Sequence, residues 1–381
     1  MIQPILFLAQ ETVEVHQSAF AKAWAAIPEP LQRYLIWPTI KFLIAFAIVQ
    51  GIVAAMTYIE RRMLGFMQAR LGPNRVGPYG LFQAIADPVK LMLKEDIVPS
   101  SAERVTYFLG PMLPLIPAFV VFCLIPFGPP PMFAITRVNV GLLLILALTS
   151  TGVYGIILGG WASNNKFSLI GGLRSAAQMV SYEVPFGLSI VGVLMLCGSF
   201  DLVKIVRYQE THLWNVIPQF LGCFIFLVAM IAETNRAPFD LPEAESELVA
   251  GFHTEYSGMK FAFFMLAEYA AMLVNSCLIV SLYFGGWTLG GVIRGHHIGF
   301  TTRNLLHMTP GGFPLGGLIG VGIFVTKVMC FMLFYIWLRG TFPRFRFDQL
   351  MDLGWKWMIP LALVNIVVTG IVVLSLQSMG I

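Results

Sequence analysis

The sequence predicts an all-α, polytopic membrane protein with about eight transmembrane helices. Of its 381 residues, 57% are hydrophobic and only 12% are charged, which is about half the charged fraction of an ordinary soluble domain. The apolar residues gather in stretches of about 20 residues, the length at which a helix crosses a bilayer. These two observations exclude an ordinary soluble domain.

The apolar stretches divide the chain into a short N-terminal segment and a long membrane domain. Residues 1–37 begin with apolar residues but lack a basic region and are too short to span, so we interpret them as extra-membrane or interfacial. Residues 38–381 form the membrane domain. Its eight expected spans are 38–59, 105–127, 138–162, 175–200, 211–232, 261–286, 315–338 and 357–377.

The basic residues indicate how these spans are oriented. With the N-terminus outside, 15 of the 24 Lys and Arg residues fall in inner loops and 8 in outer segments. Inner loops of membrane proteins carry the excess of Lys and Arg. We therefore expect the cytoplasmic loops to be 60–104, 163–174, 233–260 and 339–356.

The sequence of the first inner loop is too regular for an unstructured linker. Residues 71–80 read LGPNRVGPYG, a run of turn residues that predicts a rigid, irregular backbone. Residues 81–95 return to helical spacing with one apolar stripe, which predicts an amphipathic helix. Such a helix either anchors the loop in the membrane interface or lines a site, and the pattern allows both.

The most acidic stretch of the chain runs from Glu233 to Ser257, between the fifth and sixth spans. It contains Glu233, Asp240, Glu243, Glu245, Glu247 and Glu255, with Arg236 and His253 as its basic residues. Crowded carboxylates repel one another, so we expect some of them to stay protonated near neutral pH. A solvated loop between two helices would have a similar composition.

Three charged side chains lie deep inside expected spans: Glu183, Glu268 and Lys327. A charge in hydrocarbon costs at least ~3 kcal/mol, so such groups usually face a partner or a polar cavity. At about 1.5 Å per residue, both acids lie roughly 12–13 Å from the cytoplasmic ends of their spans. With Glu60 and Glu233 at span ends they form a graded set of acids, unless each only pairs locally to hold helices together.

Prolines and a basic loop add two further expectations. Pro185 follows Glu183 closely and should weaken that helix, and Pro111, Pro114 and Pro117 should kink the second span. In residues 339–347, three arginines alternate with three phenylalanines. This basic, aromatic face fits a headgroup anchor or a docking surface for a cytoplasmic partner.

The chain lacks sequence motifs for redox cofactors. Its five cysteines include no C-x-x-C pair, and none of its six histidines lies in the middle of an apolar span. These patterns argue against iron–sulfur, zinc and haem sites. No G-x-G-x-x-G fingerprint is present either, so we expect no dinucleotide site.

Several motifs together resemble one family. They are ERR at 60–62, ARLGPNRVGPYGLFQAIADPVKLMLKE at 69–95, GGWASNNKFSLIGGLRSAAQMVSYE at 159–183, AEY at 267–269 and PRFRFDQLM at 343–351. With the acidic stretch, they resemble the H subunit of bacterial NADH:quinone oxidoreductase (complex I) and its mitochondrial counterpart. The resemblance covers nearly the whole chain after residue 38.

The resemblance implies a membrane subunit of a proton-translocating complex in the bacterial inner membrane, with its N-terminus on the periplasmic side. It would lie at the junction with the peripheral arm and form part of the quinone cavity. The implied proton-coupling residues are Glu183, Glu233, Glu268, Glu243, Glu245 and Glu247. The implied residues of the quinone cavity are Glu60, Arg61, Arg62, Asp87, Arg236 and Asp240.

The resemblance also implies cofactors and partners. Quinone would be the substrate, whether ubiquinone or menaquinone, while this chain would hold no cofactor itself. FMN and iron–sulfur clusters would belong to partner subunits of the membrane and peripheral arms, and no nucleic acid is expected. Residues 1–37 and 287–314 match no motif, so their roles stay open.

Two other classes of function are compatible with buried carboxylates. A stand-alone proton or cation transporter would show an internal repeat, and none is seen in the sequence. A passive anchor for the peripheral arm would tolerate neutral replacements of its buried acids.

Overall fold

A computed structural model describes residues 28, 31–130, 132–242, 245–290, 292–293, 296–297 and 315–378. Most of the N-terminal segment 1–37 and most of 287–314 therefore lie outside the described residues. The chain divides into two compact units, Met1–Ile48 and Val49–Ile381. In the first, the described residues form η1 (Gln32–Ile36) and the start of α3 (Trp37–Met67).

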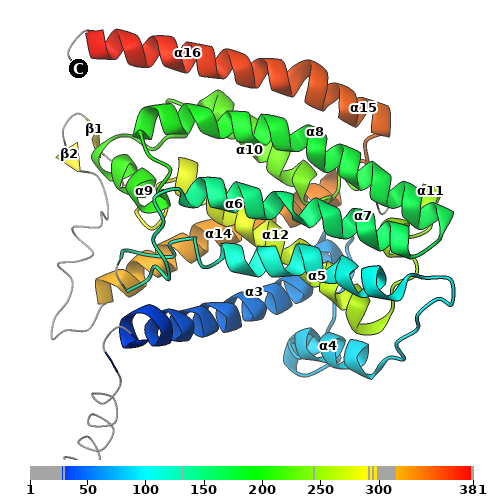
Figure 1. Cartoon of the computed structure of the whole chain (residues 1–381). Coiled ribbons are helices and arrows are strands. Elements are labelled where there is room, and N and C mark those ends of the chain that lie inside the picture. The colour runs from blue at the N-terminus through cyan, green and yellow to red at the C-terminus, as the bar shows by residue number, and fades with distance from the viewer. Residues whose placement is uncertain are drawn as a thin grey trace, which may run out of the picture. The chain divides into compact units, whose positions relative to one another are not determined.

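The described residues are overwhelmingly helical, which confirms the predicted fold class (Figure 1). After α3 come η2 (Pro78–Gly80), α4 (Gln83–Leu93), α5 (Arg104–Val121), α6 (Gly141–Ser150), α7 (Gly152–Ala162), α8 (Lys166–Cys197), α9 (Leu202–Thr211) and α10 (Phe220–Glu233). Then follow α11 (Glu245–Leu248), η3 (Gly251–His253), α12 (Gly258–Tyr283), α14 (Leu315–Thr341), α15 (Phe347–Asp352), η5 (Leu353–Met358) and α16 (Ile359–Ser378). Two short strands, β1 (Val292–Ile293) and β2 (His296–His297), pair antiparallel.

Most predicted spans correspond to long apolar helices. Within the described ranges, seven helical segments are long and apolar enough to cross a membrane: Tyr34–Met67, Arg104–Val121, Gly141–Ala162, Lys166–Cys197, Gly258–Tyr283, Gly316–Thr341 and Phe347–Ser378. The predicted span 211–232 is shorter than expected, because α9 ends at Thr211 and α10 begins only at Phe220. At 14 residues, α10 is a shorter apolar helix in the place of the predicted fifth span.

Local sequence explains several helix boundaries. The helix α8 begins nine residues before the predicted span, because the Asn165 side chain accepts a hydrogen bond from the Phe167 N–H and caps the helix. Gly198 ends it in the left-handed conformation, with φ 63°. Pro185 does not interrupt α8, and α5 stays one helix across its three prolines.

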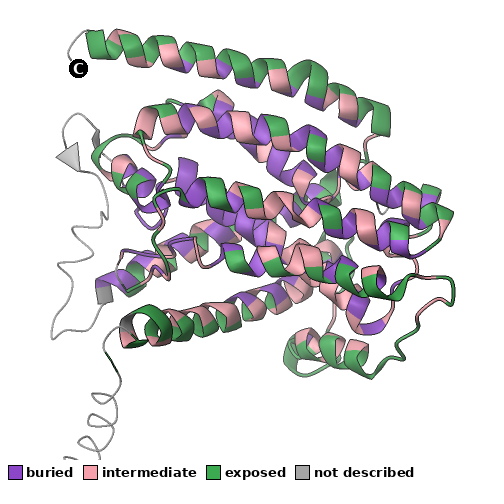
Figure 2. Ribbon diagram, in the orientation of Figure 1, coloured by how far each residue is buried: buried purple, intermediate pink, exposed green. Residues whose placement is uncertain are grey.

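The helices of the second unit pack around α12. Helix α5 packs against α7 and α12, α8 against α7, α10 and α16, and α12 against α10 and α14. Among the spans, α12 is the most buried, while α16 is largely exposed along its length (Figure 2). The exposed side chains of α16 are mainly Leu, Val and Ile, as expected of a surface that faces lipid.

The first inner loop has the predicted rigid turn and amphipathic helix. Gly77 and Gly80 have φ of 72° and 77°, and a Cβ at Gly80 would lie 2.2 Å from the Pro73 carbonyl oxygen, so only glycine fits there. In α4, none of the residues is buried, and the predicted apolar stripe, which runs from Leu81 just before α4 through Ile85, Val89 and Leu93, is exposed. Such a stripe suits either the membrane interface or a partner surface.

Candidate functional site

A cluster of charges, largely buried except for Arg339 at its edge, forms where α3, α12, α14 and the loop after α10 meet. We call it the Glu60 cluster; it comprises Glu60, Arg236, Glu268, Tyr269 and Arg339. Glu60 is only 5% exposed. One of its carboxylate oxygens accepts from Arg236 Nη1 at 3.1 Å and from Arg339, and the other accepts from the Tyr269 hydroxyl at 2.6 Å. A buried carboxylate needs such partners because burial removes its hydration.

Arg236 joins two carboxylates. Its Nη1 binds Glu60 and its Nε binds Glu268, while its guanidinium lies over the ring of Tyr269, 4.5 Å from the ring centre. Burial opposes the positive charge of Arg236, but Glu268 and Glu60 outweigh burial and raise the pKa of the guanidinium well above its ordinary value. The planar guanidinium suits this double contact better than an ammonium would.

The loop after α10 is folded so that Arg236 points back into the protein. Gln178 on α8 donates to the carbonyl oxygens of Ala232 and Phe239, at 2.7 Å each. The Phe239 ring stacks on Phe345, with ring centres 5.4 Å apart. Arg236 therefore approaches Glu60 and Glu268 from a loop that is fixed on both sides.

The remainder of the acidic stretch is held by two tyrosines. The Tyr107 hydroxyl donates to the Glu255 carbonyl at 2.7 Å, and the Tyr256 hydroxyl donates to the Tyr107 carbonyl at 3.1 Å. Their rings stack, with centres 4.2 Å apart. Burial raises the pKa of Tyr256, which keeps this hydroxyl protonated as a donor.

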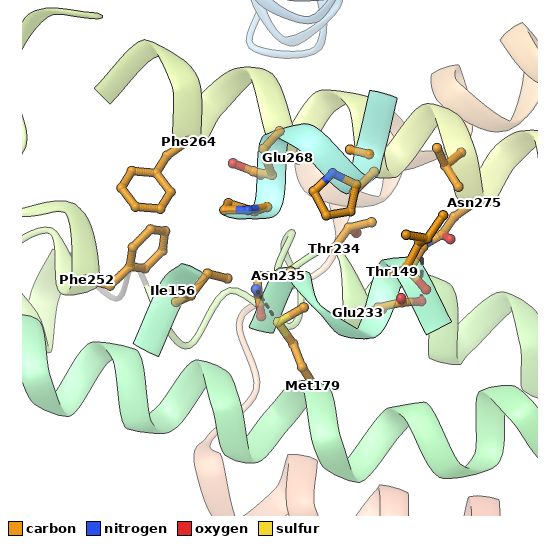
Figure 3. Close-up of a pocket in the computed structure, with 18 residues that line it drawn as sticks. Thr149, Ile156, Met179, Glu233, Thr234, Asn235, Phe252, Phe264, Glu268 and Asn275 are labelled. Atoms are coloured by element: carbon orange, nitrogen blue, oxygen red, sulfur yellow. Dashed lines mark hydrogen bonds between the residues drawn. The ribbon is translucent and has the colours of Figure 1, made fainter. Parts of the chain in front are cut away.

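A cavity of about 90 Å³ lies between Glu268 and Glu233, which both line it (Figure 3). Most of its walls are apolar, and Phe252 and Phe264 lie at one end. Its other polar lining side chains are Thr149, Thr234, Asn235 and Asn275. A cavity of this size and polarity can hold several water molecules.

Glu233 at the cavity and Glu183 next to it extend the row of carboxylates that begins with Glu60 and Glu268. Asn275 Nδ2 donates to Glu233 at 3.3 Å. Glu183 lies near enough to Glu233 for the two carboxylates to repel each other electrostatically. The Ser150 hydroxyl donates to Glu183. The structure thus brings together Glu60, Glu268, Glu233 and Glu183, which the sequence places on four different helices.

The loop acids are not crowded together where the structure describes them. Asp240 pairs with Arg344 at 3.0 Å, and the mostly exposed Glu247 pairs with Arg174 at 2.5 Å. Glu243 lies outside the described residues, and of Glu245 only the backbone is described, as the start of α11. In place of mutual repulsion, the described loop acids beyond Glu233 each have a separate partner.

The residues predicted beside Glu60 lie on other faces of α3. Arg61 pairs with Asp87 of α4 at 2.7 Å. Arg62 donates to the Tyr58 hydroxyl at 2.6 Å and to the Tyr79 carbonyl at 2.8 Å. Arg61 and Arg62 therefore tie the first inner loop to α3, and Glu60 alone of the ERR motif enters the buried cluster.

Several contributors to the site are not predicted by the sequence. The alternation of arginine and phenylalanine assigns Arg339 to a basic surface, but it reaches inward to Glu60, and Arg344 of the same surface reaches Asp240. Tyr269 lies within the AEY motif, which is a signal that could identify it. Asn275 and Ser150 have no distinguishing signal, because single polar residues are common in apolar helices.

The described residues contain no group of three His, Cys, Asp or Glu side chains that could hold a metal ion. The family model described as NADH dehydrogenase matches residues 40–370.

Several proteins named as H subunits of NADH-quinone oxidoreductase are similar over most of their length. One from Brevibacillus brevis is 47% identical over 89% of this chain and 94% of its own. One from Thermomicrobium roseum is 47% identical over 87% and 96%, respectively. One from Cytophaga hutchinsonii is 42% identical over 90% and 98%.

Proposed function

Because this chain belongs to the NADH dehydrogenase family, as an H subunit of NADH-quinone oxidoreductase (complex I), we propose that it forms part of the quinone cavity and couples quinone reduction to proton translocation. It is a multi-pass membrane subunit of that enzyme complex. The proposal places the Glu60 cluster next to the quinone cavity, at the junction with the peripheral arm. The cytoplasmic side is assigned from the excess of basic residues in the inner loops.

The single observation that carries the proposal is that Arg236 is shared between Glu60 and Glu268. Two carboxylates that share one buried cation titrate as a coupled group. A change of charge on Glu60 therefore alters how strongly Arg236 binds Glu268, and the reverse also holds. Glu268 and Glu233 line the same cavity. A change of charge in the Glu60 cluster would therefore alter the electrostatic environment of Glu233 through Glu268.

Quinone reduction supplies such a change, because it requires two electrons and two protons. Electrons would arrive from FMN and iron–sulfur clusters on partner subunits. Protons would leave or enter the Glu60 cluster, and the cavity between Glu268 and Glu233 gives room for water to carry them. Glu183, next to Glu233, would pass the change further into the membrane domain.

The other predicted residues have supporting parts in this proposal. Arg61, Asp87 and Arg62 fix the first inner loop against α3. This loop would shape the entrance to the quinone cavity. Asp240 with Arg344, and Glu247 with Arg174, would link the loop acids to neighbouring segments. Glu243 and Glu245 stay candidates on the family resemblance alone.

The experiment is Glu60→Gln in the intact complex. Gln keeps the size and hydrogen bonding of a protonated Glu but cannot ionise. Quinone-linked NADH oxidation should fall severely, while NADH oxidation by an artificial acceptor upstream of quinone should be unchanged. The matched control is Asp352→Asn, which removes a carboxylate from an exposed ion pair with Lys356.

One result with Glu60→Gln would count against the proposal, and another would move the test to Glu233→Gln. Normal quinone-linked oxidation in Glu60→Gln would favour a passive anchor for the peripheral arm. An equal loss of both activities would show failed assembly, in which case the same assay on Glu233→Gln, which leaves the Glu60 cluster intact, decides the question.

A further inference from the structure

Lys327, in the middle of α14, has an environment that the proposed proton path does not explain. Its ammonium lies 2.6 Å from the carbonyl oxygen of Phe284, 3.0 Å from that of Gly286 and 2.5 Å from that of Thr288. The indole ring of Trp214 lies 4.6 Å away. An ammonium has three protons to donate, so three neutral backbone groups satisfy all of them.

The turn that supplies these carbonyls closes the C-terminal end of α12. The last carbonyls of a helix lack partners within the helix and carry its negative dipole end, which favours a cation there. Gly285 and Gly286 have φ of 71° and 53°. A Cβ at Gly285 would lie 2.6 Å from Trp214 Nε1, and one at Gly286 would lie 2.7 Å from Val206, so the backbone can follow this path only with glycine.

Other contacts hold the same turn independently of Lys327. Gln209 on α9 accepts from the Gly285 N–H at 3.0 Å. Thr288 donates from its hydroxyl to the Gly285 carbonyl at 2.7 Å. The three carbonyl oxygens are therefore aimed at one point, which is the arrangement of a small cation site.

Two other residues of α14 also make polar contacts. Tyr335 and Arg339 follow Lys327 by eight and twelve residues, toward the end of the helix that meets the Glu60 cluster. The Tyr335 hydroxyl donates to the Met230 carbonyl of α10 at 3.2 Å, and Arg339 binds Glu60. Lys327, Tyr335 and Arg339 thus make polar contacts at three levels along α14.

Helix α12 meets α14 at two of these levels. Tyr269, in the middle of α12, shares Glu60 with Arg339, and the turn after α12 binds Lys327. Asn275 lies between the two connections, and Glu268 directly precedes the first. The first connection consists of ionisable groups, while the second joins an ammonium to neutral carbonyls and does not depend on the protonation of any carboxylate.

We propose that Lys327 is a positioning residue: its ammonium occupies a cation site at the C-terminal end of α12 and fixes α12 against α14. Glu268 and Asn275 are thereby kept in register with Arg236 and Glu233 while the charges of the Glu60 cluster change. The site accepts any small ammonium group of suitable size, and Lys327 supplies one covalently. The effect on turnover rests on the proposed function, but occupancy of the site does not.

The test is chemical rescue of Lys327→Ala in the detergent-purified complex, where no pH gradient exists for an amine to dissipate. Quinone-linked NADH oxidation should fall several-fold, and methylammonium chloride should restore most of it. Sodium chloride at equal ionic strength should not. Lys327→Met should stay impaired with either salt, because its side chain fills the space, and Lys327→Arg should retain more activity than Lys327→Met.

Three results would overturn the inference. Wild-type turnover in both Lys327→Ala and Lys327→Met would show that the site is dispensable. An assembled but impaired Lys327→Ala complex that methylammonium does not rescue would show that the ammonium is not what matters. Recovery of thermal stability without recovery of turnover would reduce Lys327 to a structural contact.

The proposed function can fail separately. If Glu60→Gln and Glu233→Gln both turn over normally while Lys327→Ala is impaired and rescued, the cation site stands and the coupling role of the carboxylates falls. If those two variants are impaired while Lys327→Ala is normal, only the inference about Lys327 falls.

Discussion

Replacing Arg236 with methionine should sharply lower quinone-linked turnover. The substitution keeps a long side chain but removes the cation from between Glu60 and Glu268. Glu60 keeps Arg339 and Tyr269, whereas Glu268 loses its ion pair with Arg236 at the edge of the cavity. The charge change at the Glu60 cluster would then no longer reach Glu268 through a shared partner.

The magnitude follows from burial. Arg236 is 8% exposed, and removing one partner of a buried ion pair costs about 3–5 kcal/mol. If a third of about 4 kcal/mol falls on the limiting step, turnover drops about tenfold. Arg236→Lys keeps the charge but can serve the two carboxylates less well, so its loss should be smaller.

The assay compares quinone-linked NADH oxidation with oxidation by an artificial acceptor, in membranes whose assembly is checked on native gels. Lys356→Met is the matched control, because it removes a cation from an ion pair that is exposed on both sides and such pairs contribute about 0–1 kcal/mol. Turnover of Arg236→Met within about twofold of wild type, with normal assembly, would refute the reasoning about the shared arginine, since the loss would then be well under the tenfold worked out from burial.

The remaining predictions concern residues on either side of this cluster. Glu183→Gln and Glu233→Gln should assemble normally yet severely lower quinone-linked turnover and proton uptake in vesicles, with a weaker effect for Glu268→Gln; normal pumping in the first two would favour a passive anchor. Arg62→Ala should lower quinone reductase activity but spare the artificial acceptor reaction, because it releases the Tyr79 carbonyl and loosens the first inner loop; equal loss of both would indicate failed assembly. Arg346→Glu should weaken attachment of the peripheral arm in sedimentation assays, since Arg346 is exposed between α14 and α15; an arm that stays bound at ordinary salt would mark this surface as a lipid anchor.

Much of the fold follows from patterns along the chain. Apolar length predicts most of the membrane helices, and the run of turn residues at 71–80 predicts an irregular loop whose Gly80 tolerates no side chain. Capping explains why α8 begins at Lys166, although hydropathy places the start later. The late start of α10 at Phe220 escapes prediction because residues 211–219 include several apolar side chains that continue the hydropathy of the helix.

Only part of the site can be predicted from the sequence. Acids inside apolar spans or at their ends are conspicuous, so Glu183, Glu233 and Glu268 can be named in advance. Their partners cannot, because pairing depends on which helix faces meet in three dimensions. Arg339 is 279 residues from Glu60 in the chain, and in a loop rich in arginine nothing in the sequence distinguishes the one that turns inward.

The most direct test of the central claim is a redox-induced infrared difference spectrum of the intact complex, recorded as bound quinone is reduced. If the carboxylates change protonation with quinone reduction, the wild-type spectrum contains a protonated carboxyl band that shifts or disappears in Glu233→Gln and changes in Glu60→Gln. A spectrum without any carboxyl band, or one identical in wild type, Glu60→Gln, Glu183→Gln, Glu233→Gln and Glu268→Gln, would contradict the claim that this protein couples quinone chemistry to proton movement through its buried acids.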